Sequence, residues 1–144
     1  MSAETAAPPQ FRFHHLGVVV PHVEQAERFV SFFGAKELWR GDAPKYEALC
    51  VFVAFAGIRI EFIVPTGERL KGFNKGRGGI HHVAVECDGP IDEVTKRLVD
   101  ERGAVMLEEA AVAGASLLVN FLQPICTGGV LVEIVSKTGV ARDL

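Results

Sequence analysis

The chain has 144 residues, 49% of them apolar, which is enough to bury the core of one domain or of two small fused modules. Its net charge of −3 provides no basic surface for nucleic acid. No apolar run approaches the ~20 residues that span a bilayer. The N-terminal stretch MSAETAAPPQ lacks the basic and apolar regions of a secretory signal. These features predict a cytoplasmic protein that binds neither nucleic acid nor membrane, with residues 1–10 as a disordered tail.

The first half of the chain is expected to form a strand, a helix and three more strands. Phe11 to Val20 is rich in strand-forming residues and stops at Pro21. Apolar residues recur at helical spacing from Val23 to Phe33, with Gly34 directly after them. Shorter strands are expected over residues 35–40, 47–56 and 58–64, with a turn over 41–46.

The second half repeats this order after a polar, glycine-rich connection over residues 65–78. A strand is expected over 79–87 and a helix over 91–102, which Gly103 ends. Three strands follow, over residues 104–107, 116–122 and 129–136. The fold class is therefore α+β, one domain over 11–144 built from two tandem βαβββ modules, 11–66 and 79–136.

Short motifs recur at corresponding places in the two halves. The segment around His14-His15 matches the segment around His81-His82, and the strand that ends in Glu61 matches the strand that ends in Glu133. The offset between the copies is 67 residues at His15 and 72 residues at Glu61, a drift that small loop insertions explain. Two His-His pairs and two strand glutamates at matched positions are hard to ascribe to chance.

The repeat predicts a metal site. Equivalent residues of two modules meet where a pseudo-twofold axis relates them, so the histidines and the glutamates are expected to converge. A carboxylate in an apolar strand is costly to bury unless it is paired or bound to metal. Two imidazoles and two carboxylates suit zinc, cobalt, nickel, manganese or iron(II), and two glutamates balance one divalent charge. From the residues alone, either histidine of each pair could be the ligand, or all four residues could be structural.

Three cysteines, Cys50, Cys87 and Cys126, form no CxxC pair and are an odd number. Buried free thiols in a reducing cytosol are the simplest interpretation. Asn120 lies on an apolar strand and either faces a cavity or is a buried, hydrogen-bonded amide.

At these motifs the chain resembles the vicinal oxygen chelate superfamily, and within it the methylmalonyl-CoA epimerases. The resemblance covers nearly everything from Phe13 to Val135 and is carried by residues 79–86 (GIHHVAVE), 91–93 (IDE) and 127–133 (TGGVLVE). It implies a curved mixed sheet around one divalent ion, held by His15, Glu61, His82 and Glu133. It also implies an isomerase that moves the α-proton of an acyl-CoA thioester, and a homodimer.

The chain departs from the epimerases at three segments. The strand after the first loop reads ALCVF over residues 48–52 and has no acid, where those enzymes often carry a proposed base. Residues 113–116 (AGAS) and 123–125 (QPI) also differ from the epimerase pattern. The catalytic candidates are therefore Glu133, as ligand and base, and Glu47, the carboxylate nearest to the missing acid.

Three other functions use the same fold. A glyoxalase I-type lactoylglutathione lyase needs the same four ligands. An iron(II) dioxygenase typically uses two histidines and one carboxylate, so Glu61 would be surplus. A metal-free small-molecule binding protein usually lacks the ligands altogether.

Overall fold

The structure is a computed structural model that describes residues 7, 9–136 and 144. The tail predicted over residues 1–10 falls mostly on 1–6 and 8, which lie outside the described residues. The strands are β1 (Phe11–Val19), β2 (Lys36–Ala43), β3 (Ala48–Phe55), β4 (Ile58–Pro65), β5 (Gly79–Cys87), β6 (Val112–Gly114), β7 (Leu117–Leu122) and β8 (Val132–Ser136). The helices are α1 (Val23–Phe33), α2 (Glu68–Lys71) and α3 (Ile91–Arg102), with 3-10 turns η1 (Pro44–Tyr46), η2 (Phe73–Gly76) and η3 (Pro124–Cys126).

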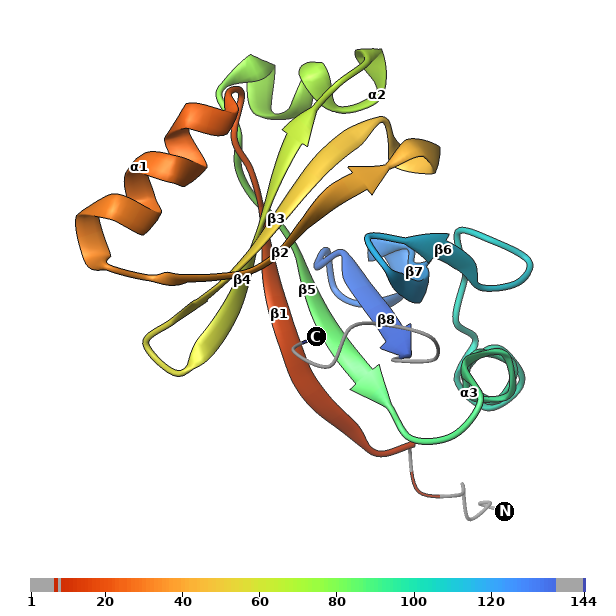
Figure 1. The fold of residues 1–144 in the computed structure, drawn as a ribbon. Helices are drawn as coiled ribbons and strands as arrows, with labels where there is room; N and C mark the ends of the chain where they lie inside the picture. The colour runs from red at the N-terminus through yellow and green to blue at the C-terminus, as the bar shows by residue number, and fades with distance from the viewer. Residues whose placement is uncertain (1–6, 8, 137–143) are drawn as a thin grey trace.

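All of these strands belong to one sheet, in the order β2-β3-β4-β1-β5-β8-β7-β6. The central pair, β1 and β5, is antiparallel, and each is flanked by the last strand of its own module in parallel pairing. If each strand of one module is replaced by its counterpart in the other, the same strand order is read from the opposite edge of the sheet. A pseudo-twofold repeat requires this symmetry. Figure 1 shows the sheet curving so that β2-β3 and β6-β7 lie toward the same side of the central pair. The expected α+β class and curved mixed sheet are confirmed.

The two longer helices cover the outer face of the sheet. Ala26 of α1 is fully buried in a cluster with Val51 and Val53, and Val94 of α3 packs in a cluster with Ile134. Side chains on the inner face form a third cluster. The inner face is therefore the place where a site can be enclosed by both modules.

Both of these helices have the bounds that the sequence predicts. α1 and α3 end at Gly34 and Gly103, whose φ angles of 63° and 70° are left-handed and favour glycine. Apolar periodicity and a glycine stop depend on local sequence alone, which is why these two elements were predictable.

The strands after each helix differ from the prediction. Residues 104–107 form no strand beyond an isolated bridge at Met106, and the edge strand β6 forms instead at Val112–Gly114. The side chain of Asn120 explains this, because it bonds both the N–H and the C=O of Glu108 at 3.0 Å and holds that stretch as a loop. Asn120 is thus the buried amide, not a cavity residue. β2 continues through the expected turn to Ala43, and β8 starts only at Val132.

A register shift interrupts the β1–β5 pairing twice, once on each strand. His14 is the extra residue on β1, between the pairs that Phe13 and His15 make. His81 is the extra residue on β5 in the same way. A bulge lets consecutive side chains point to one side of a sheet, which strict alternation forbids. Both His-His pairs are therefore placed on bulges.

None of the three cysteines forms a disulfide; Cys50 and Cys87 are buried, and Cys126 is exposed, contrary to the expectation of a buried thiol. In the described part of the chain, no helix is long and apolar enough to cross a membrane.

Candidate metal centre

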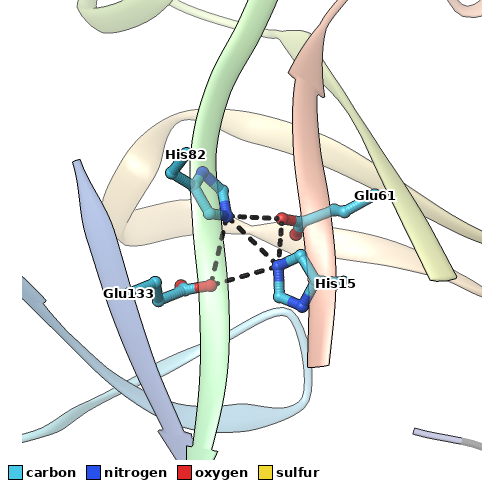
Figure 2. Close-up of side chains that lie close together, drawn as sticks. All are labelled: His15, Glu61, His82 and Glu133. Atoms are coloured by element: carbon cyan, nitrogen blue, oxygen red, sulfur yellow. Dashed lines mark hydrogen bonds and ion pairs between the residues drawn. The ribbon is translucent and has the colours of Figure 1, made fainter. Parts of the chain in front are cut away.

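Four side chains from the four central strands converge on the inner face of the sheet (Figure 2). His15 comes from β1, Glu61 from β4, His82 from β5 and Glu133 from β8. All four residues are at most 6% exposed. In the sheet, Glu61 lies opposite Gly17 on β1 and Glu133 lies opposite Ala84 on β5, which are matched positions of the two modules.

The ligand atoms have the spacing of a coordination sphere. The Nε2 atom of His15 lies 3.1 Å from Oε1 of Glu61 and 3.1 Å from Oε1 of Glu133. The Nε2 atom of His82 lies 3.4 Å and 3.2 Å from the same oxygens. All four atoms lie within 4.8 Å of one another. Atoms about 2.1 Å from a common ion are about 3.0 Å apart at neighbouring positions, so the residues fit one ion.

The two histidine nitrogens lie close together between the carboxylates. The Nε2 atoms of His15 and His82 are 3.1 Å apart. Burial disfavours every charged form here, but the opposite charges outweigh it, raising the pKa values of both histidines and lowering those of Glu61 and Glu133. If both histidines carried a proton on Nε2, two N–H donors would point at each other at 3.1 Å, which is repulsive. A cation between two nitrogen and two oxygen lone pairs has no such conflict.

The two carboxylates are not held equally. Oε1 of Glu133 is buried and has no hydrogen-bond partner among the described residues, although both histidine nitrogens are near it. Oε1 of Glu61 lies 3.1 Å from Nε2 of His15, and its carboxylate lies beside the buried thiol of Cys50. The pKa of this thiol is raised by burial and by Glu61, so the thiol stays protonated. Glu61 therefore has a thiol neighbour in addition to the two histidine nitrogens.

The first histidine of each pair orients the second. The Nδ1 atoms of His14 and His15 are 2.7 Å apart, and those of His81 and His82 are 2.8 Å apart. A histidine that offers Nε2 to a metal carries its proton on Nδ1, so we assign His15 and His82 as donors and their neighbours as acceptors. Burial and the adjacent histidine lower the pKa values of His14 and His81 to about 4, which keeps both neutral. The other nitrogen of His14 then donates to the carbonyl of Leu144 at 2.6 Å.

Two phenylalanines and a glycine fix the rings of His15 and His82; from the sequence, Phe52 could wall a pocket but was more simply a core residue. Phe52 meets the ring of His15 edge-on at 5.0 Å, and Phe121 meets the ring of His82 at 5.4 Å. Gly17 lies under the ring of His82, where a Cβ would come within 2.2 Å of it. In each module a phenylalanine lies opposite the glutamate on the neighbouring strand, Phe52 beside Glu61 and Phe121 beside Glu133. The sequence could have indicated these ring contacts, because the phenylalanines repeat together with the glutamates.

A cavity of about 270 Å³ opens over the four ligands. Its wall is mainly apolar and includes Leu70, Leu117 and Leu131. The phenol of Tyr46 and the guanidinium of Arg69 are further polar groups on the wall. An apolar pocket with a few convergent polar groups is typical of a small-molecule site.

Glu47 lies elsewhere. It is exposed, has a left-handed φ of 52°, is not among the residues that line the cavity, and packs its carboxylate against Gly67. The structure thus brings together the four predicted ligands and leaves this predicted base outside. The catalytic role of Glu47 stays a prediction without support from its position.

The fold and the four convergent side chains are those of the vicinal-oxygen-chelate class of proteins, in which paired modules each supply a histidine and a glutamate to a set that fits one metal ion. The model of the Glyoxalase/Bleomycin resistance protein/Dioxygenase superfamily matches residues 14–121. The chain belongs to this superfamily.

Several proteins similar to this chain in sequence and in structure are named methylmalonyl-CoA epimerases. The bovine mitochondrial methylmalonyl-CoA epimerase is 33% identical over 128 residues, covering 85% of this chain and 73% of that protein. Methylmalonyl-CoA epimerase from Mycobacterium tuberculosis has a TM-score of 0.77 at 24% identity, covering 86% of each chain. A methylmalonyl-CoA epimerase solved with methylmalonyl-CoA has a TM-score of 0.78 at 18% identity, covering 93% and 98%. The protein is an enzyme whose relatives are isomerases.

Proposed function

We propose that this protein is a metal-dependent epimerase that abstracts the α-proton of a malonyl-type acyl-CoA thioester, such as methylmalonyl-CoA. The observation that carries the proposal is the buried set of two histidines and two glutamates beneath an apolar cavity. The bovine relative is named for this activity, and a fold neighbour was solved with this substrate. A divalent ion held by the set would polarise the thioester carbonyl and stabilise the negative charge that develops when the α-proton leaves.

The chain supplies orientation and exclusion of water. His15 and His82 stay fixed because their Nδ1 protons are bonded to His14 and His81. The apolar wall removes water from around the reacting carbon, which strengthens the electrostatic interactions within the cavity. The cavity volume accommodates the acyl end of the thioester, and the rest of the substrate would lie outside the cavity.

Glu133 is the proposed base. Its Oε1 is buried and has no hydrogen-bond partner among the described residues, whereas Glu61 adjoins the thiol of Cys50. A carboxylate without this thiol contact can accept a proton at a lower cost in broken bonds. Glu61 then acts as a ligand alone.

The test is exchange of the α-proton of methylmalonyl-CoA in heavy water, followed by mass spectrometry, with manganese- or cobalt-loaded protein. We expect exchange by the wild type. Glu133→Gln should exchange about 10²- to 10⁴-fold more slowly, the usual contribution of a general base, with metal content measured in parallel. Glu61→Gln is the matched variant and should lose much less. Absence of exchange by the metal-loaded wild type would refute the epimerase function.

The homodimer, the cytoplasmic location and the choice among cobalt, manganese, nickel, zinc and iron stay predictions. Sedimentation of the full chain, cell fractionation and metal analysis of the purified protein test them in turn.

A further inference from the structure

The cavity wall holds one polar atom that neither the fold nor the metal centre uses. The hydroxyl oxygen of Tyr46 is buried and has no hydrogen-bond partner among the described residues. Tyr46 belongs to η1 and lines the cavity above the ligands. A buried hydroxyl without a partner is costly, so a tyrosine in such a place is expected to serve a bound molecule.

Neighbours from the inter-module connection and from the second module hold the ring of Tyr46 in place. The Cζ atom of Arg69, on α2, lies 5.2 Å from the ring centroid in a cation–π contact. Phe121, on β7, meets the ring edge-on at 5.8 Å. Gly114, on β6, leaves room for the ring, because a Cβ there would be 3.4 Å from Cε2 of Tyr46. The hydroxyl is therefore fixed before any ligand arrives.

The surroundings keep this hydroxyl as a donor. Burial, together with the negative charges of Glu108 and Glu133, raises the pKa of Tyr46 to about 12, against the opposing charge of Arg69. At neutral pH the group is an O–H that needs an acceptor. Arg69 adds a positive charge on the same wall, and one of its N–H groups is anchored to the carbonyl of Lys45 at 3.3 Å.

We infer that Tyr46 and Arg69 form a second attachment point for the ligand of the metal centre: the Tyr46 hydroxyl donates a hydrogen bond to a ligand oxygen, and Arg69 selects ligands that carry a carboxylate. The class of ligand is thus an anionic acyl compound with oxygen atoms at both ends, not a neutral carbonyl compound. Its identification with a malonyl-type thioester rests on the proposed function. The attachment point itself does not.

The chain contains a single tyrosine, which gives a direct test. In zinc-loaded protein labelled with ¹³Cζ-tyrosine, the one signal reports hydrogen bonding of Tyr46. Malonate and methylmalonyl-CoA, titrated separately, should each shift this signal, whereas acetone, which has no carboxylate, should not. If neither acid moves the signal, the inference is overturned.

Single substitutions measure the contributions of Tyr46 and Arg69 to ligand binding separately. Tyr46→Phe removes only the hydroxyl and should weaken malonate binding about tenfold to a hundredfold, the range for a hydrogen bond to a charged acceptor, with metal content unchanged. Arg69→Gln should weaken malonate binding about threefold to tenfold at low salt, and less at high salt, because Arg69 is exposed. Lys96→Gln makes the same charge change on α3, outside the cavity lining, and is the control. Wild-type malonate affinity in Tyr46→Phe would also overturn the inference.

Failure of the proposed function is distinguishable from failure of this inference. A Tyr46 signal that responds to malonate, in a protein that does not exchange the α-proton of methylmalonyl-CoA, refutes the epimerase and keeps the attachment point. Exchange of the α-proton together with an unresponsive Tyr46 signal supports the epimerase and refutes the attachment point.

Discussion

The Nδ1 atoms of His81 and His82 lie 2.8 Å apart, although residues that follow each other on a regular strand point to opposite faces. The bulge at His81 makes the contact possible, and the bulge at His14 repeats it in the other module. The first histidine of each pair is thus a positioning residue. It acts through the ligand beside it.

Replacing His81 by phenylalanine tests this role. His81→Phe keeps a ring beside Phe73 but removes the acceptor for the Nδ1 proton of His82. We expect metal affinity to fall about 10- to 100-fold, the usual effect of losing such an orienting bond. Competition with a chromogenic chelator measures it. The matched control is His22→Asn, because His22 is exposed and outside the site; unchanged affinity in His81→Phe would contradict the role.

Gly17 should be intolerant of even one added methyl group. In Gly17→Ala the new Cβ would fall 2.2–2.6 Å from three atoms of the His82 ring, so the ring must move off the shared centre. We expect metal affinity to drop at least about tenfold, as for other losses of ligand orientation, while the far-UV circular dichroism spectrum stays native. Gly72→Ala is the control, since nothing lies within 4 Å of its added Cβ. Equal metal binding by both variants would show that the ring position is not constrained as described.

Removal of metal should destabilise the protein. An ion that binds only the folded state adds about 2.7 kcal/mol of stability at a free concentration 100 times its Kd, which raises Tm by several degrees. Differential scanning fluorimetry with and without a chelator measures the shift. His15→Ala, which lacks one ligand, should show little or no shift with added metal; a shift as large as that of the wild type would place the ion elsewhere.

The single tyrosine should lose its proton at a higher pH in the folded protein than in the unfolded chain. The pKa of Tyr46 is raised to about 12, mainly by burial, whereas an unfolded tyrosine titrates near 10. The folded state therefore favours the neutral phenol. The contribution of this group to the free energy of unfolding is lost progressively as pH rises from about 10 toward 12. Absorbance at the tyrosinate band reports this one residue, and Tyr46→Phe provides the blank. A midpoint near 10 in folded protein would contradict the buried placement of the hydroxyl.

Much of the fold followed from local patterns. α1 and α3 were predictable to the residue because helical periodicity and a glycine stop are local features. The convergence of His15, Glu61, His82 and Glu133 was predictable because the duplication marks these residues twice, and the resemblance selected His15 and His82 from their pairs. The structure explains that choice, since the bulges turn the first histidines into acceptors.

Other parts depend on contacts that no local pattern encodes. The loop at residues 104–111 is set by Asn120, twelve residues from its partner Glu108. The exposure of Glu47 follows from its left-handed backbone at the end of η1, which residue type does not reveal. Tyr46 joins the site only because η1 of one module packs against β6 and β7 of the other.

An anomalous difference map from crystals of the manganese- or cobalt-loaded protein would show directly whether these four side chains hold the ion. We expect one strong peak on the inner face of the sheet, about 2.0–2.3 Å from Nε2 of His15, Nε2 of His82 and an oxygen of each of Glu61 and Glu133. A fully loaded protein whose ion lies outside this set of four, or is bound by His14 or His81 in place of their neighbours, would contradict it.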